Sequence, residues 1–97
     1  MRLIIEPLAQ ADIDEIADWY DGQDFDVGSA FLVSLKSLFS RVTANPARYP
    51  LHKPGLRRAR LQRFPHNVFY IHKSESVFII AVLHHRRDLS VLDERVN

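Results

Sequence analysis

The chain has 97 residues, of which 46% are hydrophobic, and it contains no cysteine. This length fits one small domain over residues 1–97, which can bury about two-thirds of the surface of its unfolded chain. Disulfides, thiolate nucleophiles and cysteine-based zinc sites are excluded. The N-terminus has no signal-peptide core, and no apolar run reaches the roughly 18 residues of a membrane helix. We therefore expect a soluble, cytoplasmic protein without membrane contact.

The net charge of +1 conceals a strong segregation of charge along the chain. Residues 1–26 carry eight acids against one arginine, and residues 27–87 carry eleven lysines or arginines against one glutamate. The last ten residues are again net negative. One interpretation is a basic surface made for an anionic partner. The other is that the acidic segment pairs with the basic one inside the fold, and the sequence favours neither.

The first quarter of the chain predicts a strand followed by a helix. Residues 2–6 are short, aliphatic and stopped by a proline, which is typical of a strand. From residue 8 to about residue 20, apolar residues recur at helical spacing, and Gly22 is expected to end this helix. Its acidic residues, Asp12 among them, are expected to lie mostly on the solvent side.

The rest of the chain predicts one more helix and three strands. The helix runs from about residue 27 to an Asn-Pro stop at residues 45–46. Strands are expected at residues 56–63, 68–73 and 77–84, the last apolar on both faces and therefore central in the sheet. A short polar tail follows. The predicted class is α+β, in the order β-α-α-β-β-β, with a helical hairpin packed on a mainly antiparallel four-stranded sheet.

Short motifs occur along the whole chain in a fixed order. They are Ala9-x-x-Asp12-Ile13-x-x-Ile16 with Trp19-Tyr20, Asn45-Pro46, Arg57-Arg58-x-Arg60, Phe64-Pro65, Phe69-Tyr70 and Leu83-His84-His85-Arg86-Arg87-Asp88. From about residue 3 to residue 95 this order resembles the RelE/ParE superfamily of toxins from type II toxin–antitoxin systems, and in particular its ParE branch. The resemblance implies a RelE/ParE-like fold.

The resemblance also implies partners and a mode of action. A cognate antitoxin encoded beside the toxin would restrain it in a hetero-oligomer, and the toxin would contact operator DNA only through that antitoxin. Some relatives arrest growth by inhibiting DNA gyrase, and others cut mRNA on the ribosome. The main hypothesis for this chain is a gyrase-inhibiting toxin that acts by binding, without a catalytic centre. The rival is a ribosome-dependent endoribonuclease. A third hypothesis is a non-toxic chain that serves only in antitoxin complexes and operator repression.

The ribonuclease hypothesis meets difficulties in the expected catalytic residues. RNA cleavage through the 2′-hydroxyl needs a base, an acid and cations around the phosphate. Arg58 and Arg60 fall where ribonuclease relatives carry lysines, but arginine stays protonated and is a poor base. The arginine expected in the next strand is Asn67, and the terminal tyrosine is replaced near residues 91–92. If the chain is a ribonuclease, its catalytic residues are predicted to be Arg58, Arg60, His84, His85 and Arg86.

The histidine pair His84 and His85 has a structural interpretation beside the catalytic one. Imidazole titrates near neutral pH and can serve as a general acid. Adjacent residues of a strand point to opposite faces, so at most one of the two is expected to face a shared site. We favour His84 as a hydrogen-bonded cap of the last strand. Because the histidines lack a cysteine partner and helical spacing, the sequence predicts no metal and no cofactor.

The arginines are the candidate residues for binding gyrase or the antitoxin. Partner binding and protection of an edge strand remain equally open for any one of them. A local ion pair within Arg86-Arg87-Asp88 is a further alternative. Most aromatic residues, from Trp19 to Tyr70, are expected in the core or lining grooves. The predicted binding residues are Arg57, Arg58, Arg60, Arg63, Arg86 and Arg87.

Overall fold

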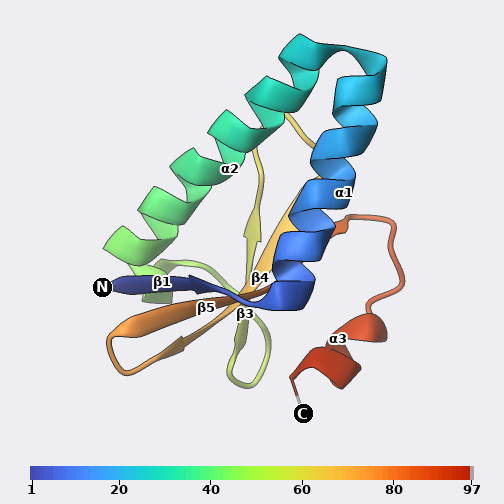
Figure 1. Cartoon of the computed structure of the whole chain (residues 1–97). Helices are drawn as coiled ribbons and strands as arrows, with labels where there is room; N and C mark the ends of the chain where they lie inside the picture. Colours follow the sequence, from blue (N-terminus) through green and yellow to red (C-terminus); the bar gives the residue numbers. More distant parts are fainter. Residues whose placement is uncertain (97) are drawn as a thin grey trace.

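The computed structural model describes residues 1–96 and contains a helical hairpin, a five-stranded sheet and a short third helix (Figure 1). In chain order the elements are β1 (Arg2–Ile5), α1 (Pro7–Gln23), α2 (Phe25–Ala44), the 3₁₀ turn η1 (Pro46–Arg48), β2 (Leu51–Lys53), β3 (Leu56–Arg60), β4 (His66–Lys73), β5 (Ser76–His84) and α3 (Val91–Arg95).

The sheet has the strand order β1-β5-β4-β3-β2. Within residues 1–96, β1 and β5 pair in parallel and the other neighbouring strands pair antiparallel. The predicted α+β class with a mainly antiparallel sheet is therefore confirmed. The count of four strands is wrong, because β2 adds a fifth. With three residues between Pro50 and Pro54, β2 is too short to show the alternation that marks a strand in a sequence.

The turn between the helices differs from the prediction. Gly22 does not end the first helix, and α1 continues to Gln23. The chain reverses at Asp24, whose backbone is extended with φ of −166°. The Asp24 side chain accepts a hydrogen bond from the Asp26 N–H at 2.9 Å and so caps α2, which begins at Phe25. A good N-cap thus sets the boundary that glycine was expected to set.

The second half of the chain also departs from the expected boundaries. β3 ends at Arg60 rather than at residue 63, and the chain turns so that the Leu61 N–H donates to the His66 carbonyl at 3.0 Å. Arg63 lies in this loop with φ of +72°. The segment expected to be a polar tail forms α3, because Leu92 gives it a buried face.

β5 lies between β1 and β4, which confirms that it is a central strand, and both faces of the sheet are covered. The face toward the helical hairpin buries Tyr70, Val77 and Ile79 against residues of α1 and α2. The opposite face buries Phe69 and Leu83 together with Leu92 of α3 and its neighbours. Within residues 1–96 no helix is both long and apolar enough to cross a membrane.

Candidate functional site

One end of the sheet gathers most of the predicted binding residues. Arg60 of β3 lies opposite Asn67 of β4, which lies opposite Leu83 of β5. The loop after β3 and the turn after β5 therefore leave the sheet at the same end. Since neighbouring strands lie roughly 4.8 Å apart, Arg60 and the end of β5 are separated by about 10 Å. We call this the arginine end, defined by Arg60, Arg63, His84, His85, Arg86 and Arg87.

Two predicted binding residues lie outside the arginine end. Arg57 faces the helical side of the sheet, where it donates to the carbonyls of Ala47 at 3.3 Å and Tyr49 at 2.6 Å. These bonds tie η1 and the segment after it to β3. Arg58 lies opposite Phe69, on the other face of the sheet, and shares that face with Arg60 but lies one strand repeat further from the end.

The arginine end holds guanidinium groups without a partner inside the protein. Among residues 1–96, the side chains of Arg60, Arg63, Arg86 and Arg87 make neither a hydrogen bond nor a salt bridge, and all four are exposed. Asp88 does not pair with its arginine neighbours. It accepts a hydrogen bond from the Ser90 N–H at 2.9 Å, which lowers the pKa of its carboxyl group. The guanidinium groups are thus available to a partner.

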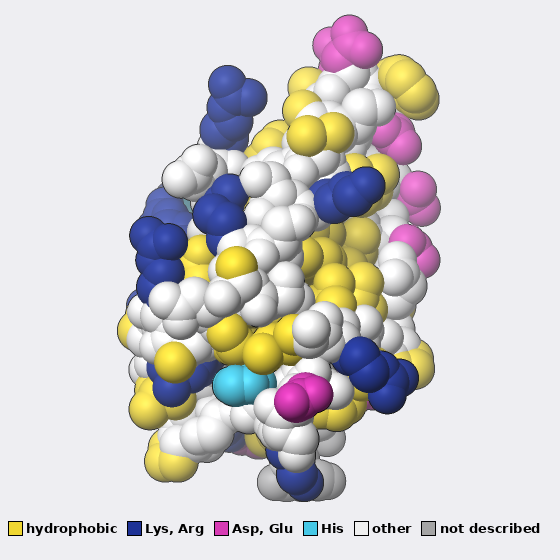
Figure 2. All heavy atoms as spheres, turned by 90° about the vertical axis from the view of Figure 1, so that its left-hand side faces the viewer, with side chains coloured by type: hydrophobic (Ala, Val, Ile, Leu, Met, Phe, Trp, Pro, Cys, Tyr) yellow, Lys and Arg dark blue, Asp and Glu magenta, His cyan; other side chains and the backbone are white. Residues whose placement is uncertain are grey.

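Within residues 1–96 the acidic segment and the basic segment make no salt bridge with each other. Within the described chain there are two salt bridges, Lys53–Asp93 and Arg95–Asp12, and neither joins the acidic residues 1–26 to the basic residues 27–87. Figure 2 shows acidic side chains along one flank and a group of basic side chains on the opposite flank. Of the two interpretations of the charge pattern, internal pairing of helix and sheet is therefore wrong.

The side chains of His84 and His85 were expected to point to opposite faces of the sheet, but they do not. The strand ends at His84, the chain turns, and the two rings stack with centroids 4.6 Å apart. His84 is a cap of the strand, because its Nδ1 accepts a hydrogen bond from the Arg86 N–H at 3.1 Å. Desolvation and the positive charges of His85 and Arg86 lower the pKa of His84. Because the Arg86 N–H occupies Nδ1 of His84, this nitrogen is not available to take a proton from a substrate.

His85 has a different hydrogen-bonding arrangement. Its Nδ1 lies 3.2 Å from the Pro65 carbonyl oxygen, and because a carbonyl can only accept, Nδ1 carries the proton. Nε2 makes no hydrogen bond within residues 1–96. Of the two histidines, His85 is the one whose geometry permits acid–base chemistry.

A third histidine, His66, is buried beneath the arginine end. It is 5% exposed, its ring packs edge-on against those of Tyr20, Phe31 and His84, and its Nδ1 has no hydrogen-bond partner among the described residues. Burial, followed by repulsion from His84 and His85, lowers the pKa of His66 to about 4. The sequence alone predicted no structural role for His66.

The burial of His66 predicts that the protein becomes less stable in mild acid. The unfolded chain protonates this ring near pH 6.5 and the folded chain only near pH 4, so protons favour the unfolded state between these values. We expect the free energy of unfolding to be about 2–3 kcal/mol lower at pH 4.5 than at pH 7, measured by urea unfolding. The variant His66→Phe should lose most of this pH dependence; an unchanged dependence would contradict the assignment.

Beside the arginine end, a cavity of about 570 Å³ lies between α1 and the end of β5. One side is a stripe of α1 that includes Ile16 and Trp19, and the other side includes Val82 and His84. Trp19, expected in the core or a groove, is 62% exposed and lines this cavity. The full lining is Asp12, Glu15, Ile16, Trp19, Tyr20, Pro65, His66, Val82, His84 and Arg87. Among residues 1–96 no three His, Asp or Glu side chains lie close enough to hold a metal ion.

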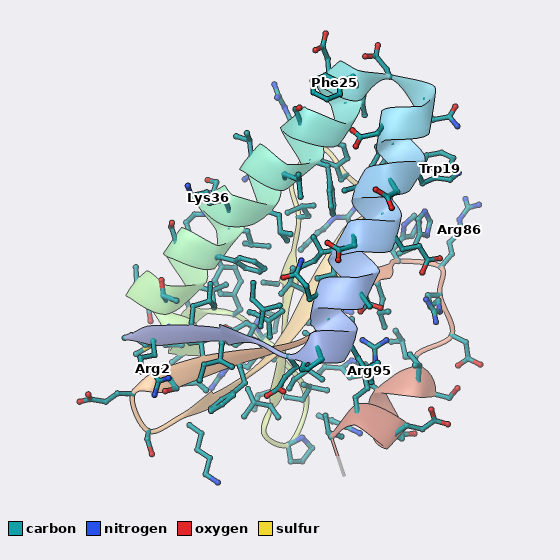
Figure 3. The ribbon with its side chains drawn as sticks, in the orientation of Figure 1. Arg2, Trp19, Phe25, Lys36, Arg86 and Arg95 are labelled. Atoms are coloured by element: carbon teal, nitrogen blue, oxygen red, sulfur yellow. The ribbon has the colours of Figure 1, made fainter. Side chains whose placement is uncertain are left out.

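A buried ion pair lies beside this cavity, which Asp12 lines, and the sequence did not predict the pair. Arg95 binds Asp12 through two hydrogen bonds of 2.6 and 3.0 Å, and their side chains are 9% and 11% exposed. The expectation that Asp12 faces solvent is wrong, because its carboxylate also accepts from the Val82 N–H at 3.0 Å. Arg95 in turn donates to the Ile80 carbonyl at 3.1 Å. Figure 3 shows Arg95 reaching from α3 to the foot of α1. The motif that contains Asp12 singled out this residue in the sequence, but no motif contained Arg95.

Comparison with known proteins gives a consistent result. The family model of the ParE toxin of the type II toxin–antitoxin system parDE matches residues 3–89. A solved chain from the chromosomal ParDE toxin–antitoxin system of P. aeruginosa is similar in fold, with a TM-score of 0.74 and 24% identity over 87% of this chain and 95% of that chain. No curated protein sequence matches significantly. The chain belongs to the ParE toxin family of type II toxin–antitoxin systems.

Proposed function

We propose that this ParE-family chain is a cytoplasmic toxin that inhibits DNA gyrase by binding it through the arginine end, until a cognate antitoxin covers the toxin in a hetero-oligomer. The observation that carries this proposal is the set of four exposed, unpartnered guanidinium groups at one end of the sheet. Such a cluster attracts an acidic protein surface, steers its approach and fixes its orientation. Operator DNA would be reached only through the antitoxin.

Binding without catalysis fits the chemistry of this end better than RNA cleavage. The arginines remain protonated and can hold an anion but cannot remove a proton. His84 uses its accepting nitrogen for the Arg86 N–H. These two facts remove most of the predicted ribonuclease residues from acid–base roles and leave them suited to electrostatic recognition.

One observation favours the rival ribonuclease function enough to test it. Nδ1 of His85 binds the Pro65 carbonyl and Nε2 makes no hydrogen bond within residues 1–96, so an imidazole nitrogen lies next to the phosphate-binding cation Arg86 in the chain. Replacing His85 by alanine abolishes toxicity if the chain cleaves mRNA, and leaves toxicity largely intact if it acts by binding. His84→Ala is the matched variant, because it removes the neighbouring ring but not the free nitrogen.

The proposed function is tested by pulse labelling after the chain is induced without its antitoxin. We expect thymidine incorporation to fall within minutes, before methionine incorporation falls, because a blocked gyrase stops replication first. The purified chain should also inhibit gyrase supercoiling. If methionine incorporation falls first and His85→Ala prevents the fall, the gyrase proposal is wrong and the ribonuclease is correct.

A further inference from the structure

The loop of residues 61–65, which joins β3 to β4 at the arginine end, leaves three successive main-chain donors without an acceptor. Within residues 1–96 the N–H groups of Gln62, Arg63 and Phe64 make no hydrogen bond. The flanking Leu61 N–H is paired, because it donates to the His66 carbonyl at 3.0 Å. Since main-chain polar groups need partners, solvent or a ligand must satisfy the three donors between them.

The carbonyl groups of the same loop are largely occupied. The Gln62 carbonyl accepts a hydrogen bond from the Ser34 hydroxyl of α2 at 3.1 Å. The Phe64 carbonyl accepts from the first N–H of β4 at 2.9 Å, and the Pro65 carbonyl accepts from the His85 N–H at 2.8 Å. The loop therefore offers a surplus of donors over acceptors, which suits an anion rather than a cation.

The backbone of Arg63 has the left-handed conformation, with φ of +72°, which is uncommon for a residue other than glycine. A left-handed residue in a turn brings successive N–H groups toward one side, as in the nests that bind anions. The loop around it is held by packing: Leu61 is 1% exposed, and the Phe64 ring lies 5.2 Å from that of Tyr20 and 5.5 Å from that of Phe31. The donors thus belong to a segment fixed on the helical hairpin.

A cavity of about 600 Å³ opens over this loop. Its lining consists of Arg60, Leu61, Gln62, Arg63, Phe64 and Pro65, and within residues 1–96 it contains no aspartate or glutamate. The guanidinium groups of Arg60 and Arg63 are exposed and make no hydrogen bond or salt bridge within the same residues. Guanidinium groups keep their charge and present several donors in a fixed fork. Main-chain and side-chain donors therefore line one cavity.

We propose that the loop of residues 61–65 is a binding site for a phosphate group, held by its three N–H groups and by Arg60 and Arg63. The oxygens of a tetrahedral phosphate can accept from the main chain and from two guanidinium groups at once, whereas one guanidinium fork already satisfies both oxygens of a carboxylate. The phosphate belongs either to a free phosphate ion or to a nucleic-acid backbone. Phosphate binding by the loop goes beyond the function proposed above, because it requires neither gyrase nor antitoxin.

The test is an NMR titration of the ¹⁵N-labelled chain with inorganic phosphate at constant ionic strength. We expect the amide signals of residues 62–64 to shift and to saturate. Arg63→Gly removes one guanidinium group but keeps the N–H, and glycine readily adopts this φ. It should raise the half-saturating phosphate concentration by at least about tenfold, because a hydrogen bond to a charged group is lost. Lys73→Gln removes an exposed cation at the opposite end of β4 and should bind like the unaltered chain.

Three results would overturn the phosphate site. The first is a shift at residues 62–64 that does not saturate, which would mean that these N–H groups are only hydrated. The second is an equal effect of acetate, which would mean that the loop does not distinguish phosphate from carboxylate. The third is unchanged binding by Arg63→Gly and by Arg60→Gln, with circular dichroism melts confirming that both variants fold.

A short DNA duplex distinguishes the two sources of phosphate. If the duplex shifts the amides of residues 62–64 and inorganic phosphate competes with it, the loop binds a nucleic-acid backbone. If the duplex leaves these amides unshifted while inorganic phosphate shifts them, the loop binds a free phosphate. Both results support the site, and neither titration contains gyrase, so failure of the site leaves the gyrase proposal to be judged by its own experiment.

Discussion

Replacing Asp12 by alanine is expected to lower the free energy of unfolding by about 3–5 kcal/mol, because it leaves the Arg95 guanidinium buried without its counter-charge. Asp12 accepts both hydrogen bonds of Arg95 and also the Val82 N–H, so one substitution removes three bonds. A domain of this size has only about 5–15 kcal/mol in total. Urea unfolding followed by circular dichroism measures the difference.

Two variants make this prediction specific. Asp18→Ala removes an exposed carboxylate from the same helix and should change the stability by less than about 0.5 kcal/mol. The double variant Asp12→Leu/Arg95→Met removes both charges, and should be more stable than Asp12→Ala because no unpaired charge stays buried. If Asp12→Ala were as stable as Asp18→Ala, the ion pair would not contribute to the free energy of unfolding.

Reversing two charges at the arginine end is expected to abolish growth arrest. Arg63→Glu and Arg86→Glu together should raise the concentration of toxin that halves gyrase supercoiling activity by about 100-fold. Each close charge pair across an interface contributes at least about 1.5 kcal/mol, or roughly tenfold. Both side chains are exposed and make neither a hydrogen bond nor a salt bridge within residues 1–96, so the fold should be unaffected.

The control for this double variant is a charge reversal elsewhere. Lys36→Glu changes an exposed cation on α2, away from the arginine end, and should inhibit gyrase like the unaltered chain. Inhibition by the unaltered chain should also weaken as salt is raised, since the contact is electrostatic. Full toxicity of the double variant, with gyrase inhibition retained, would show that the arginine end does not touch the target.

The elements with repeating patterns were predictable from the sequence, and the contacts between distant residues were not. Apolar periodicity identified both helices of the hairpin and the central position of β5. The boundary at Asp24 was missed because a side-chain cap outweighed the glycine nearby. α3 was missed because one buried leucine in five residues makes no pattern.

The candidate site shows the same division. The arginine end was predictable as a set of residue types, but its grouping depends on strand register and on a loop where Arg63 adopts positive φ. Arg57 was indistinguishable in sequence from Arg58, yet the alternation of β3 turns it to the helical face. The stacking of His84 and His85 follows from where β5 stops, which no local pattern records.

The pairing of the first strand with the last has a consequence for the order of synthesis. A ribosome makes β1 and the helical hairpin first. β1 can pair with β5 only after Ser76–Ile79 has been added, and Asp12 can form its salt bridge only after Arg95 has been added. The hairpin must spend this interval with its apolar face uncovered, because contacts so distant in sequence form late. The fold is therefore complete only after the segment that carries Arg95 has been made.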